Sequence, residues 1–235
     1  MPVRPEVKPF LAGASLVFFA PALALIFGSN AGKWAPALFS FGALICGMLV
    51  FFFRDPERKV PGDPLSIVSG ADGIVSQIAD VEDDLYLKTK AVRVSVFLNL
   101  FDVHVNRMPM AGKVVLAEYH PGKHFFAFLD KASDDNQHSA ILIQGEKTRC
   151  LVKQIVGPVA RRVVFWVKPG QTLAAGERIG MMKFGSRLDV YFPAGGVDIL
   201  VKKGQRVRAG ETVLASIKRQ PEKIEERTHE SRYRN

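Results

Sequence analysis

The stretch VKPGQTLAAGE at residues 167–177 recurs as VKKGQRVRAGE at residues 201–211. In both copies a valine leads to a glycine-glutamine pair, and a second glycine follows directly before a glutamate. Each copy predicts a strand, a glycine turn, a short apolar segment and a second glycine turn, because glycine adopts the backbone angles that tight turns require. Glycine turns recur in many β proteins, but the matched spacing of both glycines favours a true internal repeat.

Short strands dominate the rest of this region. Val92, Val94, Val96 and Leu98 alternate with other residues, which is the period-two pattern of a strand with one buried face. The segment SGADGIV at residues 69–75 resembles a third turn-to-strand unit, and helical periodicity is scarce. This layout is typical of barrel-sandwich hybrids, the fold of biotinyl and lipoyl domains. We therefore expect a mainly β, barrel-sandwich-hybrid-like domain over residues 67–219.

Two apolar runs, residues 9–31 and 34–53, precede this domain. Each is long enough to cross a hydrocarbon core of about 30 Å, which takes roughly 20 residues. We expect an N-terminal two-helix transmembrane hairpin over residues 1–53 and a turn-rich linker over residues 54–66. A shallow re-entrant hairpin is an alternative, because Pro21 would kink the first run. A cleaved signal peptide is another, although the second apolar run argues against simple secretion.

Charge predicts where the domain lies. Basic residues flank both ends of the hairpin, whereas Lys33 is the only basic residue in the turn between the two runs. The positive-inside bias therefore puts both ends and the β domain on the cytoplasmic side of the inner membrane. The net charge of +9 suits a domain held close to anionic lipid. No basic helix interleaved with stacking aromatics is present, so a nucleic-acid partner is not expected.

The remaining composition adds two expectations. Cys46 and Cys150 form neither a disulfide framework nor a metal-spaced pair, which indicates a reducing compartment and predicts no metal site. The tail at residues 220–235 is charged and nearly free of apolar residues, so we expect it to be disordered.

One predicted hairpin tip, between the two repeats, offers two residues that could be modified. Lys183 follows two methionines and precedes Gly204 by 21 residues, a spacing similar to that of biotinyl carriers. Phe184 stands where such carriers usually have methionine. The same tip holds Gly185-Ser186, where a serine hydroxyl could attack the preceding carbonyl. An ordinary exposed turn explains most Gly-Ser pairs, so other motifs must decide.

The segment FDVHVNRMP at residues 101–109 resembles the histidine motif of phosphatidylserine decarboxylases. Five further segments resemble motifs of this family in the same order: RDPER at 54–58, ADG at 71–73, HPGK at 120–123, LDKAS at 129–133 and FGS at 184–186. The resemblance covers about residues 50–216 and is similar to the short bacterial and archaeal-type branch. Biotin carriers lack these His and Asp motifs, so the enzyme is the favoured interpretation.

The resemblance implies a proenzyme that cuts itself between Gly185 and Ser186. Ser186 would become a covalent pyruvoyl group, the cofactor of the mature enzyme, and the pieces 1–185 and 186–235 would stay together as a heterodimer. The substrate would be the membrane lipid phosphatidylserine, and the product phosphatidylethanolamine. A serine needs a base to become a good nucleophile. His104 is the expected base, since histidine titrates near neutrality, and Asp72 is expected to orient it.

Two departures from the longer branch leave questions open. Phe184 and Arg187 replace the outer residues of its Leu-Gly-Ser-Thr cleavage motif, and Arg107 stands where that branch has a second histidine. His104 then serves both self-cleavage and decarboxylation, or another group such as Asp102 shares the work.

Candidate substrate contacts follow from residue chemistry. Arg107 could hold the lipid phosphate or carboxylate, and Phe125 and Phe126 could dip into the membrane interface, although buried aromatics would explain these phenylalanines equally well. The competing functions are a membrane-anchored carrier modified at Lys183 and a non-enzymatic membrane adaptor.

Overall fold

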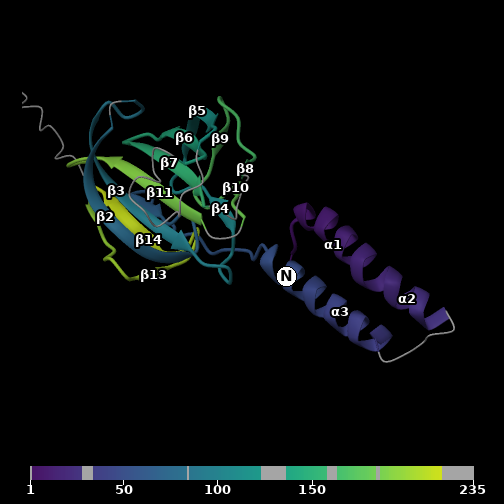
Figure 1. Ribbon diagram of the computed structural model, residues 1–235. Helices are drawn as coiled ribbons and strands as arrows, with labels where there is room; N and C mark the ends of the chain where they lie inside the picture. The colour runs from purple at the N-terminus through teal and green to yellow at the C-terminus, as the bar shows by residue number, and fades with distance from the viewer. Residues whose placement is uncertain are drawn as a thin grey trace, which may run out of the picture.

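The computed structural model describes residues 2–27, 34–83, 85–122, 136–157, 163–183 and 186–218. A helical hairpin projects from a mainly β domain (Figure 1). The hairpin comprises the 3-10 turn η1 (Pro5–Val7), α1 (Lys8–Ala14), the π-helical turn η2 (Ser15–Phe19), α2 (Ala20–Phe27) and α3 (Trp34–Phe52). The predicted fold class, a mainly β domain preceded by two apolar helices, is confirmed. The predicted tail at residues 220–235 lies outside the described residues.

Close packing holds the two arms of the hairpin together. A Cβ atom at Gly42 of α3 would lie 2.7 Å from Cβ of Phe18 in η2, so only glycine allows this approach. Phe18 and Phe19 also pair with aromatic rings of α3, those of Phe41 and Phe39, at centroid distances of 5.3 and 5.0 Å. The π-helical turn η2 ends just before Pro21, where the sequence predicts a kink because proline lacks the amide hydrogen of a regular helix.

Both arms of the hairpin are long and apolar enough to cross a membrane. The two segments are Pro5–Phe27 and Trp34–Phe52, and only 6% and 17% of their most apolar windows are buried inside the structure. Most of their side chains therefore face away from the protein. Exposed apolar surface of this extent indicates a surface that contacts lipid or another protein.

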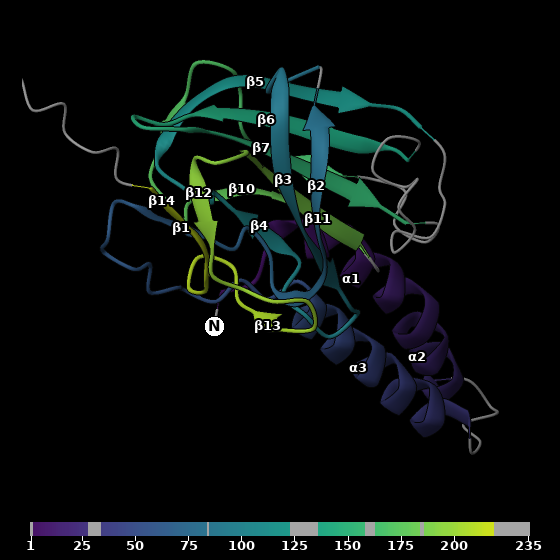
Figure 2. The same ribbon diagram turned by 90° about the vertical axis from the view of Figure 1, so that its left-hand side faces the viewer.

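Fourteen strands form the β domain over the residues that the structure describes. They are β1 (Ser66–Val68), β2 (Gly73–Asp83), β3 (Thr89–Leu98), β4 (Val105–Arg107), β5 (Gly112–His120), β6 (His138–Gln144), β7 (Arg149–Val156), β8 (Val164–Phe165), β9 (Thr172–Leu173), β10 (Arg178–Met181), β11 (Ser186–Pro193), β12 (Val197–Ile199), β13 (Arg206–Val207) and β14 (Val213–Ile217). Eight of them form one antiparallel sheet in the order β13-β2-β3-β11-β7-β6-β5-β9, and the others form the sheets β1-β14-β12 and β4-β10-β8. The strand direction turns strongly from β2 and β3 to β5 and β6, so the large sheet curls (Figure 2).

The inner face of this curled sheet carries the main core. Val94, Val96 and Leu98 of β3 and Leu188, Val190 and Phe192 of β11 are buried in this core, and the register pairs Val96 with Leu188 and Val94 with Val190. Directly opposed residues of an antiparallel pair point to the same face, so these side chains pack together. The alternation predicted for residues 92–98 is thus the alternation of a strand in the middle of the sheet.

The sequence repeat is a structural repeat. Gly170 and Gly204 both adopt a positive φ, of 93° and 86°, and their amides donate to the carbonyls of Val114 and Val75, each at 2.8 Å. In both copies, therefore, the first glycine turn docks on a strand of the large sheet, β5 or β2. The two copies therefore make the same backbone contact with two different strands of the large sheet.

The second glycine of each copy behaves in the same way. Gly176 and Gly210 have φ values of 80° and 75°, and their amides donate to the carbonyls of Met108 and Ser69, each at 2.8 Å. The acceptors come from two matching segments, since residues 69–75 pair with the second copy and residues 108–114 with the first. The third unit predicted at residues 69–75 therefore has a partner in residues 108–114.

Candidate active site

Ser186 is the first residue of β11, between β3 and β7. It is paired in register with Leu98 and Val156 and is completely buried. Its side chain points to the same face as Leu188, because alternate residues of a strand share a face. The Oγ atom has no hydrogen-bond partner among the described residues. Ser95 Oγ in the neighbouring strand β3 is also buried without a partner, so the state of Ser186 bears on function only together with the motif around it.

His104 lies in the turn just before β4 and is also completely buried. Its Nδ1 is 2.9 Å from the backbone carbonyl oxygen of Asp102, which fixes the ring orientation, and its Nε2 has no partner in the described part of the chain. The carbonyl oxygen of His104 accepts a hydrogen bond of 3.1 Å from the amide of Met182, which lies four positions before Ser186 in the sequence. The histidine motif and the serine motif therefore meet through β4 and β10.

The last residue of the membrane hairpin covers the imidazole. The ring centroid of Phe52 in α3 lies 4.2 Å from that of His104, with an interplanar angle of 36°. Burial lowers the pKa of His104 to about 4, despite the opposing effect of the Asp102 carbonyl and carboxylate. The imidazole is therefore neutral at pH 7. A neutral imidazole can accept a proton, which is the state that a general base requires.

The carboxylate of Asp102 does not contact the imidazole through any described hydrogen bond. Its Oδ2 accepts from the amide of Asn99 at 2.9 Å, and its Oδ1 pairs with Arg206 at 2.5 Å. The side chain thereby ties the turn that carries His104 to β13. Asp102 reaches His104 through its backbone, so its catalytic role stays a prediction.

Asp72 has partners in the linker and in the second repeat copy. Its carboxylate pairs with the guanidinium of Arg58 at 2.7 Å and accepts from the amide of Ala209 at 2.8 Å. Among the residues that the structure describes, no hydrogen bond joins Asp72 to His104, and the Nδ1 of His104 is 2.9 Å from the carbonyl oxygen of Asp102. The structure therefore does not bring this predicted pair together, and the orienting role of Asp72 stays a prediction.

Arg107 has partners within the protein. The side chain is buried, and its guanidinium donates to the carboxylate of Asp55 at 2.9 Å and to the carbonyls of Gly176 and Pro56 at 2.9 and 2.8 Å. These contacts connect the linker to a repeat turn. They argue for a structural role, and contact with the lipid remains only a prediction.

The other candidates divide into two groups. Lys183 is partly exposed, and its Nζ lies 5.0 and 5.9 Å from the ring centroids of Phe10 and Phe53, so it contacts the base of the membrane hairpin. Gly185, Phe125 and Phe126 lie outside the described residues, and their predicted roles stay predictions.

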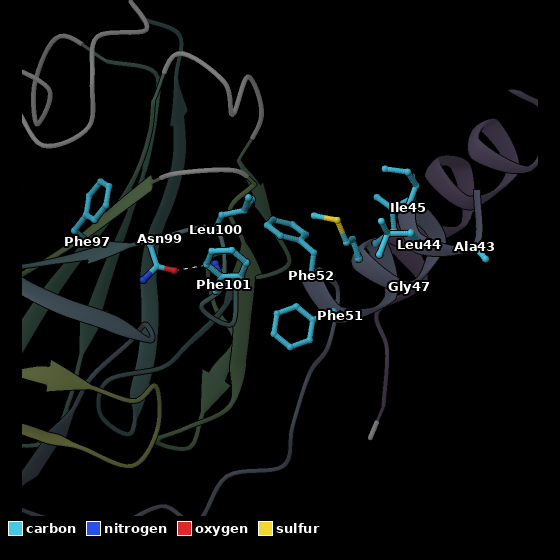
Figure 3. Close-up of a pocket in the computed structure, with 12 residues that line it drawn as sticks. Ala43, Leu44, Ile45, Gly47, Phe51, Phe52, Phe97, Asn99, Leu100 and Phe101 are labelled. Atoms are coloured by element: carbon cyan, nitrogen blue, oxygen red, sulfur yellow. Dashed lines mark hydrogen bonds between the residues drawn. The ribbon is translucent and has the colours of Figure 1, made fainter. Parts of the chain in front are cut away.

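An apolar groove of about 1100 Å³ runs between the last turns of α3 and residues 97–101 (Figure 3). Phe52 lines this groove and also covers His104, so a single ring separates the groove from the imidazole. Arg54 connects the two walls, because it donates to the carbonyls of Phe51 at 2.8 Å and Phe101 at 2.6 Å. The groove therefore brings an apolar surface to the edge of the site.

A buried polar chain beside the site was missed at the level of sequence. Ser139 donates to Oε1 of Gln154 at 2.7 Å, and Nε2 of Gln154 donates to Oδ1 of Asn106 at 2.7 Å. All three residues are completely buried. The available signal was the position of Asn106 within the histidine motif. Nothing in the sequence indicated that Gln154 would meet it.

Comparison with known proteins matches this arrangement to one family. The family model described as phosphatidylserine decarboxylase matches residues 47–215, which include both His104 and Ser186. The chain is 48% identical over 170 residues to a phosphatidylserine decarboxylase proenzyme of Carboxydothermus hydrogenoformans, a match that covers 72% of this chain and 80% of that protein. The resemblance seen in the short motifs thus extends over most of the chain, which belongs to the phosphatidylserine decarboxylase family of self-processing enzymes.

Proposed function

We propose that this chain converts phosphatidylserine to phosphatidylethanolamine and CO2, using a pyruvoyl group made from Ser186 by self-cleavage after Gly185. The observation that carries this proposal is the buried, unpartnered Oγ of Ser186, the first residue of β11, four positions after Met182, whose amide donates to the carbonyl of His104. A hydroxyl in this state fits a residue that is consumed in making a cofactor.

Maturation begins when Ser186 Oγ attacks the carbonyl carbon of Gly185. The hydroxyl proton passes to a base, for which neutral His104 is the candidate, the Oγ–C bond forms and the C–N bond breaks, leaving an ester and a free amine. Elimination then releases the carboxylate of Gly185, and hydrolysis of the remaining dehydroalanine releases ammonia and leaves the ketone. The products are the pieces 1–185 and 186–235, which we propose stay together as a heterodimer.

In the mature enzyme the pyruvoyl ketone supplies an electron sink for the electron pair that stays on the substrate carbon when CO2 leaves. This chain must then hold the substrate and move protons. His104 is the candidate that returns a proton to the substrate carbon: its Nε2, buried without a partner in the described structure, would first take up a proton from the substrate amine as the amine condenses with the ketone and then pass it to the carbon. Burial keeps competing water away from that step.

The groove between α3 and residues 97–101 supports a lipid substrate. It is lined almost entirely by apolar side chains and lies beside Phe52, which covers His104. An acyl chain could therefore stay in an apolar environment while the headgroup approaches the site. The membrane hairpin thus contributes to the site as well as anchoring the chain.

The two ends of the hairpin lie together at the β domain. The amide of Arg4 donates to the carbonyl of Phe53 at 2.9 Å, and that of Asp55 donates to the carbonyl of Pro2 at 2.9 Å. We propose that both ends and the β domain face the cytoplasm from the bacterial inner membrane, since basic residues flank both ends. Reporter fusions after Lys59 and at the C-terminus should both report cytoplasm, and a periplasmic signal from either would overturn this topology.

Intact mass measurement tests the proposed function. Purified protein should give the two pieces, and the 186–235 piece should be lighter by one ammonia than its encoded sequence. Ser186→Ala should remain one chain and form no phosphatidylethanolamine from phosphatidylserine vesicles. A single unmodified chain with full activity would contradict the pyruvoyl mechanism, and an added mass on Lys183 would favour the carrier.

A further inference from the structure

Asn106 carries a buried donor that the site described so far does not use. The residue is completely buried in β4, and its Nδ2 has no hydrogen-bond partner among the described residues. His104 Nε2 and Ser186 Oγ are in the same condition. Asn106 follows His104 by two positions, and both side chains are completely buried.

The amide of Asn106 is held in one orientation. Its Oδ1 accepts from Gln154 Nε2 at 2.7 Å, and Gln154 is fixed in turn because its Oε1 accepts from Ser139 at 2.7 Å. The carbonyl end of the amide therefore faces Gln154, and the NH2 end faces away from it. A donor that is buried, oriented and unpaired is costly to maintain in a fold, so a ligand or reacting group is its expected partner.

Gln154 connects this amide to the reacting serine. In the β7–β11 register, Gln154 lies opposite Leu188 and Val156 lies opposite Ser186. Gln154 and Ser186 therefore share a face of the sheet and are diagonal neighbours, which is within reach of a long side chain. Asn106 contacts Gln154 from the β4 side, so it approaches the same end of the sheet.

Gly180 makes this approach possible. It pairs with Asn106 in the β4–β10 register. A Cβ atom at this position would lie 2.8 Å from Nε2 of Gln154 and 2.5 Å from the carbonyl oxygen of Val164. Any side chain here would displace the glutamine that orients Asn106. This glycine of β10 thus preserves space for the polar chain.

We infer that Asn106 Nδ2 donates a hydrogen bond to the oxyanion that forms when Ser186 Oγ attacks the preceding carbonyl carbon. This inference rests on the proposed self-cleavage and gives Asn106 the role of oxyanion donor. As the Oγ–C bond forms, the carbonyl oxygen gains negative charge. A fixed donor in a dry site then stabilises the transition state more than the starting amide.

The rate of self-cleavage tests the inference in the full-length protein. Asn106→Ala should form the 186–235 piece about 10²- to 10³-fold more slowly than the wild type, which is the usual effect of removing one oxyanion donor. Gln144→Ala is the matched control, because it truncates an exposed amide side chain at the far end of β6 and should cleave at the wild-type rate. Cleavage of Asn106→Ala at the wild-type rate would overturn the inference.

A second variant separates loss of the donor from loss of structure. Asn106→Asp keeps the shape of the side chain, but its carboxyl group can donate only when protonated. Its cleavage should therefore accelerate as pH is lowered from 8 to 5, whereas wild-type cleavage should not, since the pKa of His104 is about 4. A purely structural role of Asn106 predicts no acceleration of the variant at low pH. A cleavage rate of Asn106→Asp that does not rise as the pH falls would count against the inference.

Thermal unfolding in the uncleavable Ser186→Ala background completes the test. Adding Asn106→Asp to Ser186→Ala should leave the folded structure in place at the temperature of the cleavage assay, so a slow rate cannot be assigned to unfolding. Failure of the wild type to cleave would reject the proposed function itself. Normal wild-type cleavage together with normal Asn106→Ala cleavage would reject only the role of Asn106.

Discussion

The phenyl ring of Phe52 lies 4.2 Å from the imidazole of His104, centroid to centroid, and thereby joins the end of the membrane hairpin to the candidate base. Phe52 also packs with Phe53, Val7 and Met181 in one buried cluster. Met181 is the last residue of β10, five positions before Ser186. The anchor and the catalytic domain therefore share a core at the place where chemistry is proposed.

Removing this ring should change the pH profile of self-cleavage. Phe52→Ala admits water to His104, so the lowered pKa of the imidazole should rise from about 4 toward its ordinary value of 6.5. A base works only when neutral, that is, above its pKa. The wild-type cleavage rate should therefore be constant between pH 5 and 8, while the variant should lose about tenfold in rate by pH 5.5.

Phe51→Ala is the control for this experiment. Phe51 is the neighbouring residue of α3, and its ring packs on the guanidinium of Arg54 instead of on the histidine. Its cleavage rate should stay constant over the same pH range. A constant profile for Phe52→Ala as well would show that the ring does not set the pKa of the base.

His104→Ala should slow self-cleavage by a factor of about 10² to 10⁴, the usual contribution of a general base. Any mature protein that accumulates should also form phosphatidylethanolamine slowly per pyruvoyl group. His120→Ala is the control, because His120 stacks on His138 in a separate cluster. If the His104 variant matures normally but turns over slowly, or the reverse, the two steps use different groups.

Asp72→Ala should act mainly on stability. Its carboxylate pairs with the largely buried guanidinium of Arg58, and losing one partner of such a pair leaves a poorly solvated charge. In the Ser186→Ala background we expect a loss of roughly 1–3 kcal/mol in unfolding free energy. The cleavage defect should be smaller than that of His104→Ala. An equal or larger cleavage defect with unchanged stability would support the orienting role predicted for Asp72.

Asp55 and Glu57, two acidic residues of the linker, allow the contribution of a buried ion pair to stability to be compared with that of an exposed one. Asp55 is buried and accepts from Arg107 at 2.9 Å and from Arg178 at 2.5 Å, whereas Glu57 is exposed and pairs only with Arg178 among its described ion pairs. Asp55→Ala should cost about 3–5 kcal/mol, since it leaves the buried Arg107 without its carboxylate. Glu57→Ala should cost less than about 1 kcal/mol. Urea unfolding of both variants, uncleaved, checks the difference, and equal losses would contradict it.

The parts of this protein that were predictable from sequence are those with local signatures. The turns at Gly170 and Gly204 require positive φ, so glycine spacing revealed the repeat. Short motifs pointed to His104 and Ser186 in the same way. The contacts of Phe52 with His104, and of Gln154 with Asn106, join residues far apart in the chain. Such contacts depend on how the helices and sheets pack together, and no local sequence pattern predicts that packing.

Asp72 illustrates a contact that residue types suggested and that the described hydrogen bonds do not include. An aspartate, a histidine and a serine suggested a hydrogen-bonded triad, but the backbone carbonyl of Asp102 supplies the contact to Nδ1. Residue types alone cannot distinguish a carboxylate from a carbonyl as the acceptor. Arg58 lies only 14 positions before Asp72, yet nothing in the linker sequence indicated that its guanidinium would take this carboxylate.

The position of β11 has a consequence for the life of the molecule. The strand that begins at Ser186 pairs with β3 along eight register positions and with β7 along six, so a cut directly before it removes none of these pairings. Once cut, however, melting yields two separate chains, and the midpoint temperature should rise with protein concentration, unlike that of Ser186→Ala. The precursor reaches this fold as one chain, with its strands at high effective concentration. After cleavage the strands of the two pieces are no longer held at high effective concentration. We therefore expect the precursor to fold first and to be cut afterwards.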